Sequence, residues 1–199
     1  MLTEITIILD RSGSMQSIAS DAIGGFNAFL ATQRREPNVG REPGSDATRL
    51  TLVLFDDKYE VPYKSIPLTE VPDLTDHTFL PRGSTALRDA IGRTLSKMTR
   101  SFAARPVEQK PATIIIAILT DGEENASHEY SAAHIADLIE AKKELGWQFI
   151  FLAANQDAIA TAAALRIDAA DALNFVSNQA GTATAFRELS DKVIEKRKK

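Results

Sequence analysis

The sequence lacks cysteine, has no apolar run long enough to cross a bilayer, and shows no charged-then-apolar leader at its amino terminus. A chain without cysteine forms no disulfide, and a membrane-spanning helix needs about 20 consecutive apolar residues. These absences predict a cytoplasmic protein that does not bind membranes. With 199 residues and 44% apolar content, the chain has enough material for one well-packed core and hardly enough for two. We therefore expect residues 1–199 to form a single domain.

Clustered positive charge is also scarce. The formal net charge is -4, and the only basic cluster is the run of four residues at positions 196–199. Nucleic-acid binding depends on many clustered cationic side chains. A basic run at the end of a helix is explained more simply by its favourable interaction with the helix dipole. The sequence therefore predicts no nucleic-acid partner.

Signatures of several enzyme classes are missing as well. The sequence has three histidines, and it contains neither a His-Glu-x-x-His pattern nor a Gly-x-x-x-x-Gly-Lys-Ser/Thr phosphate loop. His128 and His134 are six residues apart, which predicts different faces of a helix and favours surface or capping roles over metal binding. No histidine is an evident partner for a serine nucleophile.

Apolar strands alternating with amphipathic helices make up most of the chain. Almost wholly apolar runs predict strands that are buried on both faces, as in a parallel sheet; they lie at 5–9, 50–55, 113–119 and 148–153. A weaker run at 173–176 predicts a sixth strand. Around Pro62 apolar and polar residues alternate, which predicts an antiparallel edge strand because proline cannot donate to a β ladder. The fold class is α/β: a doubly wound, mostly parallel six-stranded sheet with one antiparallel edge strand and helices on both faces.

Helical periodicity separates these strands. The helices are expected at about 17–34, 87–102, 135–145, after Asp157, and at 182–197. Gly24 and Gly25 lie inside the first of them and predict close packing of that helix on the sheet. Leu145 is expected to face inward, and Gly146 to follow the helix end. The polar stretches 36–48 and 67–84 are expected to be loops, the first exposed and the second functional or disordered.

Oxygen-bearing side chains follow the first strand on alternate residues. Asp10, Ser12 and Ser14 supply one carboxylate and two hydroxyls, and Gly13 allows a tight turn. Hard oxygen donors of this kind suit a small divalent cation. Taken alone, the same pattern is more often an ordinary turn and helix cap.

Two later segments bring oxygen donors to the same edge of the predicted sheet. Thr85 precedes a helix, which it could also cap, and Asp121 directly follows the most apolar strand. Ligands of open α/β sheets bind at the carboxyl ends of the strands, where these side chains converge. The joint occurrence is much more specific than any single motif.

These five residues resemble the metal-ion-dependent adhesion site of the von Willebrand factor A family. That site is built from Asp-x-Ser-x-Ser, a distant threonine and Thr-Asp-Gly, and the matching positions here are Asp10, Ser12, Ser14, Thr85 and Asp121. The resemblance covers nearly the whole chain and is strongest to stand-alone bacterial and phage members. It implies a non-enzymatic, protein-binding module in which the cation engages an acidic residue of a partner protein.

Elementary electrostatics supports a cation at this position. Two carboxylates about 4 Å apart repel by roughly 4 kcal/mol at an effective dielectric constant of 20, and a divalent ion removes that repulsion. Magnesium is the expected ion because it demands an octahedron of hard oxygens, although manganese and calcium remain open.

Four residues next to the ligands are expected to form the partner-binding rim: Arg11, Ser84, Glu123 and Glu124. The two glutamates could repel an incoming carboxylate or select a partner with a basic rim. Arg11 could offset their charge.

Two rival functions remain open. The same topology hosts metal-dependent phosphatases and other phosphoryl-transfer enzymes, although phosphatases with a nucleophilic aspartate carry a second acid where this chain has Ser12. Alternatively, the metal is structural and the domain is a passive scaffold.

Overall fold

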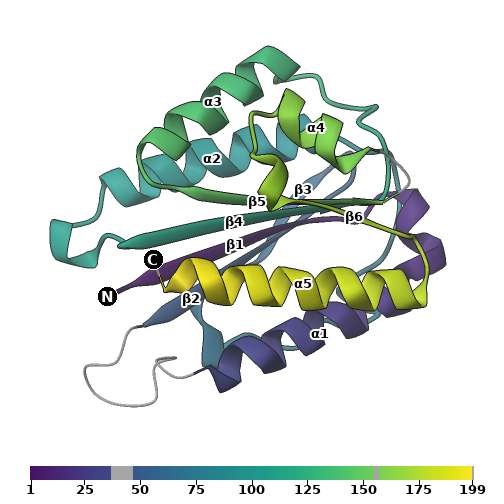
Figure 1. Cartoon of the computed structure of the whole chain (residues 1–199), viewed down its shortest axis with the longest axis horizontal. Coiled ribbons are helices and arrows are strands. Elements are labelled where there is room, and N and C mark those ends of the chain that lie inside the picture. Colours follow the sequence, from purple (N-terminus) through teal and green to yellow (C-terminus); the bar gives the residue numbers. More distant parts are fainter. Residues whose placement is uncertain (37–46, 155–156, 199) are drawn as a thin grey trace.

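The structure, a computed structural model, describes residues 1–36, 47–154 and 157–198. Within these residues one six-stranded sheet has the order β3-β2-β1-β4-β5-β6 (Figure 1). Its strands are β1 (Thr3–Asp10), β2 (Thr48–Phe55), β3 (Tyr59–Pro67), β4 (Thr113–Thr120), β5 (Gln148–Ala154) and β6 (Ala172–Phe175). Only β2 and β3 pair antiparallel, and the other neighbours are parallel. The predicted fold class is confirmed.

Helices cover both faces of the sheet. Two of them, α1 (Ala19–Arg35) and α5 (Gln179–Arg197), pack on one face. The opposite face carries α2 (Leu87–Ala103), α3 (Ala132–Glu144) and α4 (Ala158–Ala164), as Figure 1 shows. Short 3-10 turns complete the chain at η1 (Gly13–Ile18), η2 (Leu68–Glu70), η3 (Val107–Gln109) and η4 (Ala169–Asp171). None of the helices in the described part of the chain has the length and apolarity to span a membrane.

Side-chain alternation along β1 divides the core into two layers. Ile5, Ile7 and Leu9 pack with α1 and α5, whereas Ile8 packs with α2 and α3. All eight residues of β1 are buried, since neighbouring strands and both helical layers enclose it. This double coverage explains why the central strands are almost wholly apolar.

Three local expectations were wrong. Leu145 is 70% exposed, because α3 ends at Glu144 and Leu145 takes the capping position. His128 lies in the loop before α3 rather than on a helix. Helix α5 begins at Gln179, three residues earlier than expected, because the Asn178 side chain accepts a hydrogen bond from the Gly181 N–H (2.8 Å). Gly146 follows the helix end as predicted, in a left-handed backbone conformation with a φ of +82°. Of the expected connector 36–48, residues 37–46 lie outside the described residues, as do 155–156.

The edge strand β3 is less regular than its sequence pattern suggests. Tyr59 and Val61 pack on the α2 side of the sheet, but Tyr63 packs on the α1 side. Register shifts in the β2–β3 pairing lie between Leu50 and Leu52 and between Leu52 and Leu54. A bulge of this kind adds a residue and changes which face the following side chains occupy.

One glycine of the pair in α1 allows close contact with another helix rather than with the sheet. A Cβ on Gly25 would lie 2.2 Å from Cδ2 of Phe186 on α5, whereas a Cβ on Gly24 would meet nothing within 4 Å. The predicted close packing is therefore present at Gly25, but its partner is α5.

The two glycines should respond in opposite ways to alanine. Gly25→Ala should lower the free energy of unfolding by about 1–3 kcal/mol, because the new methyl group overpacks the α1–α5 contact. Gly24→Ala should raise it by up to about 1 kcal/mol, the difference in helix propensity. Urea unfolding of both variants measures this, and equal effects would contradict the packing explanation.

Candidate metal centre

Parallel pairing of β1 with β4 brings two carboxylates to one edge of the sheet. Leu9 is paired with Leu119, so Asp10 at the end of β1 lies near Asp121, which follows β4. Asp10 is fully buried and Asp121 is 3% exposed. Buried carboxylates require hydrogen bonds, a counter-charge or a proton.

Hydrogen bonds hold Asp10 in place. Its Oδ1 accepts from the Ser12 N–H (2.7 Å), and its Oδ2 accepts from the Thr120 hydroxyl (2.5 Å). Burial nevertheless raises the pKa of Asp10 to about 6, with a further contribution from the charge of Asp121. Burial also raises the pKa of Asp121, against the opposing effect of a hydrogen bond from Ser14. Burial thus opposes the charged form of both carboxylates.

The hydroxyls converge with Asp121. Ser14 Oγ donates to Oδ1 of Asp121 (2.6 Å) and lies 3.0 Å from Ser12 Oγ. A Cβ on Gly122 would lie 3.3 Å from Ser14 Oγ and 3.7 Å from Thr85 Oγ1. Both hydroxyls thus border the same small space, which the glycine keeps open. Ser14 is exposed while the other donors are buried, so this space is reached from the Ser14 side.

Thr85 does not cap the following helix. Ala86 occupies the N-cap position of α2, and no side chain makes a capping hydrogen bond there. The Thr85 backbone is instead bound to Asn125: the Thr85 N–H donates to Asn125 Oδ1 (2.9 Å), and the Asn125 N–H donates to the Thr85 carbonyl (3.0 Å). Ser12 likewise stands at the N-cap of η1 without a capping bond from its side chain. Helix capping therefore does not account for these hydroxyls.

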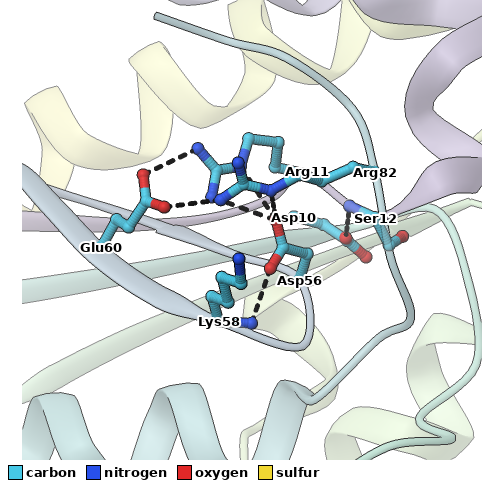
Figure 2. A network of polar contacts seen from close by, with 7 residues as sticks. All are labelled: Asp10, Arg11, Ser12, Asp56, Lys58, Glu60 and Arg82. Atoms are coloured by element: carbon cyan, nitrogen blue, oxygen red, sulfur yellow. Dashed lines mark hydrogen bonds and ion pairs between the residues drawn. The ribbon is translucent and has the colours of Figure 1, made fainter.

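Arg11 points away from the expected rim, which corrects that expectation. Its side chain is 3% exposed and binds Asp56 (3.0 Å) and Glu60 (2.9 Å), as Figure 2 shows. Arg82 binds the same two carboxylates from the loop that leads to Thr85. The arginines hold the pKa of Glu60 down to about 2. This cluster of two arginines and two acids ties the Asp10 loop, the β2–β3 turn and the Thr85 loop together.

The remaining rim residues divide into two kinds. Glu124 is turned inward, which corrects its expected place on the rim. It accepts hydrogen bonds from the Arg88 and Ser127 N–H groups (both 2.8 Å) and from the Ala126 N–H. These bonds outweigh the effect of burial and lower its pKa. Ser84 and Glu123 are exposed beside the candidate ligands.

The donor set fits a divalent cation. It combines two buried carboxylates with three hydroxyls: Asp10, Asp121, Ser12, Ser14 and Thr85. In the described ranges no group of three or more histidine, cysteine or acidic side chains could hold a metal. Two carboxylates with neutral oxygens favour a hard ion such as magnesium.

Sequence reasoning missed the role of Asp56. It follows β2, the strand next to β1, and therefore lies at the same sheet edge as Asp10. The position of Asp56 directly after a predicted buried strand was the sequence signal that could have identified it. Asp56 is fully buried but accepts from Arg11 and Arg82, so its charge is balanced within the protein.

The contribution of Asp10 to the stability of the metal-free protein should fall as pH rises from about 4 to 6. The folded-state pKa of Asp10, about 6, exceeds its ordinary value of 3.8, so the unfolded chain loses this proton first. Deprotonation then favours unfolding: the contribution is complete below pH 4 and has disappeared above pH 6. A shift of this size corresponds to about 3 kcal/mol.

Urea unfolding in metal-free buffer at pH 4 to 7 measures this effect, with Asp10→Asn as the reference that removes the titrating group. The free energy of unfolding of the wild type minus that of the variant should fall across this range. A difference that does not change with pH would contradict the assignment.

Comparison with known proteins finds similarity in structure alone. No protein-family model matches the sequence, and no curated protein does. Among solved structures, the vWF domain of the type V pili tip protein Mfa5 from Porphyromonas gingivalis matches with a TM-score of 0.67 and 12% identity, over 96% of this chain and 94% of that one. The pilus adhesin SpaC from Lactobacillus rhamnosus GG matches with a TM-score of 0.68 and 14% identity, over 96% and 30%.

A third match is proximal thread matrix protein 1 from the mussel byssus, in a structure with a zinc-occupied MIDAS motif. Its TM-score is 0.64 at 13% identity, over 96% of this chain and 45% of that one. The chain thus spans less than half the length of the mussel protein. Identities this low show similarity of fold alone, and the structural match extends over nearly the whole of this chain. This chain has the von Willebrand factor A fold.

Proposed function

We propose that the chain is a non-enzymatic protein-binding module that engages a partner carboxylate through a divalent cation, magnesium being the first choice. The observation that carries the proposal is the convergence of two buried carboxylates and three hydroxyls on one opening at Ser14. The cation would be held by Asp10, Ser12, Ser14, Thr85 and Asp121. Once bound, it supplies positive charge that attracts an anionic oxygen from outside the chain.

The protein itself supplies position and charge. Asp10 is held by Ser12 and Thr120, and the arginine cluster around Asp56 fixes the loops on which Ser12 and Thr85 lie. Asp56 is paired with two arginines, whereas Asp10 and Asp121 bring their carboxylates to the opening. Two carboxylates would only balance the charge of a divalent ion. Little net negative charge would therefore remain to repel a further carboxylate from a partner.

The exposed rim would influence which partner binds. Ser84 and Glu123 lie at the surface beside the ligands, whereas Arg11 and Glu124 are engaged within the protein. Glu123 disfavours acidic surroundings of the partner carboxylate and favours basic ones. Of the two glutamates expected on the rim, only Glu123 is therefore proposed to act on the partner.

The solved relatives support a binding role. One is described as a pilus adhesin, and another contains a zinc-occupied MIDAS motif. The zinc belongs to that relative, so the preference for magnesium rests on the oxygen donors of this chain. The cytoplasmic location stays a prediction.

Magnesium should stabilise the wild-type protein against heat and should not stabilise Asp121→Ala. Binding at 100 times the dissociation constant adds about 2.7 kcal/mol, which corresponds to about 5–10 °C for a domain of this size. Differential scanning calorimetry with chelator and with millimolar magnesium measures the shift.

Asp191→Ala is the matched control, since Asp191 is an exposed aspartate on α5, remote from the centre. Its shift should equal that of the wild type. If magnesium, manganese and calcium all leave the wild-type melting temperature unchanged, the metal centre is refuted.

Partner binding should require both the cation and its ligands. The wild type and Ser12→Ala/Ser14→Ala are used as baits in cell extract, in magnesium and in chelator. Proteins retained only by the wild type in magnesium are then purified, and their exposed acidic residues are replaced by amides. Loss of at least tenfold in affinity upon a single replacement is the expected result.

Two results would contradict the proposal. Retention that survives chelation indicates a scaffold with a structural metal. Magnesium-dependent hydrolysis of p-nitrophenyl phosphate that disappears in Asp10→Asn indicates a phosphatase.

A further inference from the structure

A second candidate binding site lies at the other end of β1. A groove of about 470 Å³ opens between α2 and the strands β2 and β3. Glu4 lines it, six residues before Asp10, which is about 20 Å along an extended strand. None of the five candidate metal ligands lines the groove. Any ligand bound there is therefore independent of the metal centre.

The floor of the groove is apolar and has a built polar end. Val61, Met98 and Phe102 contribute apolar surface from both the sheet and α2. At one end Glu4, 1% exposed, accepts a hydrogen bond from the Ser65 hydroxyl (2.9 Å). Few polar groups on a mostly apolar lining are typical of small-molecule pockets, and the volume falls in their usual range.

The protein supplies its own partners to Glu4 at the polar end. Glu4 also accepts from the Thr51 hydroxyl (3.3 Å) and pairs with Arg105 at 3.8 Å, although burial still raises its pKa. Ser65 has a left-handed backbone conformation, with a φ of 48°, in the irregular strand β3. Arg105 thus already provides a cation beside Glu4.

Positive charge at the rim lacks counter-charge. Lys64, Lys97 and Arg100 line the groove, and in the described part of the chain none of them forms a salt bridge. The Lys97 ammonium lies 4.1 Å from the centre of the Tyr59 ring. Burial lowers the pKa of Lys97, and the charges of Arg93, Arg100 and Lys64 lower it further. An anion placed among these groups would relieve their mutual repulsion.

The form of the edge strand decides what kind of anion fits. A peptide would dock most simply by adding a strand to β3, but Pro62 and the register shifts interrupt the edge that it would pair with. A compact ligand meets no such obstacle. We propose that the groove between α2 and β2–β3 binds an anionic amphiphile, with a carboxylate or phosphate head at Lys64, Lys97 and Arg100 and a short apolar chain on Val61 and Phe102.

Isothermal titration with octanoate, octyl phosphate, octanol and octyltrimethylammonium, all below micelle-forming concentrations, tests the proposal. The two anions should bind with one-to-one saturation, and the alcohol and the cation at least tenfold more weakly. A preference between octanoate and octyl phosphate identifies the head group. Decanoate should bind about fifteenfold more tightly than octanoate, because each of its two additional CH₂ groups tightens binding about fourfold when buried. Amide shifts in NMR spectra should cluster on β3 and the second half of α2.

Two charge variants with the same change in net charge separate the groove from general electrostatics. Lys97→Gln/Arg100→Gln should weaken octanoate binding at least tenfold. Arg35→Gln/Arg187→Gln, exposed positions on α1 and α5 across the sheet, should leave it within twofold. Val61→Trp fills the floor without changing charge and should weaken octanoate and decanoate alike, with circular dichroism confirming that each variant is folded.

Three results would overturn the proposal. Octanol binding as tightly as octanoate removes the role of the cations. If the two charge variants weaken octanoate binding equally, the cations of the groove act only through the helix end and the overall charge of the protein, and they form no head-group site. Absence of saturable octanoate binding up to 10 mM removes the site altogether, whatever the outcome at the metal centre.

Discussion

The parallel pairing of β1 with β4 is the constraint on which the candidate metal centre depends. Parallel strands end at the same edge of a sheet, and each of these two leads directly into an aspartate. The resulting carboxylates are buried near each other, with their pKa values raised. Such an arrangement is unfavourable unless a proton or a cation compensates it. The fold therefore places two buried carboxylates near each other, and three hydroxyls lie beside them.

Three neighbouring strands end in an aspartate at this edge, yet their environments differ. Asp10 and Asp121 receive hydrogen bonds from neutral groups, whereas Asp56 receives two arginines. The same residue type thus provides a candidate metal ligand at two positions and a fixed anchor at the third. The anchor matters to the site because Arg11 adjoins Asp10, and the Asp56 carbonyl accepts from the Ala86 N–H beside Thr85 (3.1 Å).

The two ends of β1 carry opposite electrostatic character on the same face of the sheet. At the carboxyl end, the buried carboxylates of Asp10 and Asp121 lie near each other. At the amino end, Glu4 pairs with Arg105, while Lys64, Lys97 and Arg100 remain without a salt bridge in the described ranges. One end is suited to a cation and the other to an anion. Irregularity of β3 keeps the second site open, since the edge strand does not follow a simple alternation.

The sequence by itself determined the fold class, the strand order along the chain, and the presence of oxygen donors at two strand ends. These follow from local patterns: apolar runs indicate buried strands, period 3.6 indicates helices, and polar residues after a strand lie at its end. Helix ends were less certain, as Leu145 shows, because a cap depends on one or two backbone hydrogen bonds.

Only the tertiary structure decided the partner of each charged side chain. Nothing local separates Asp56, which pairs with Arg11 and Arg82, from Asp121, which accepts a hydrogen bond from Ser14. Arg11 and Glu124 were expected at the surface, and both turn inward to groups far away in the sequence. The groove beside Glu4 likewise combines residues from β1, β2, β3 and α2. The energy of a buried charge depends on the groups that the folded chain places within a few ångströms of it, and sequence spacing does not predict which groups these are.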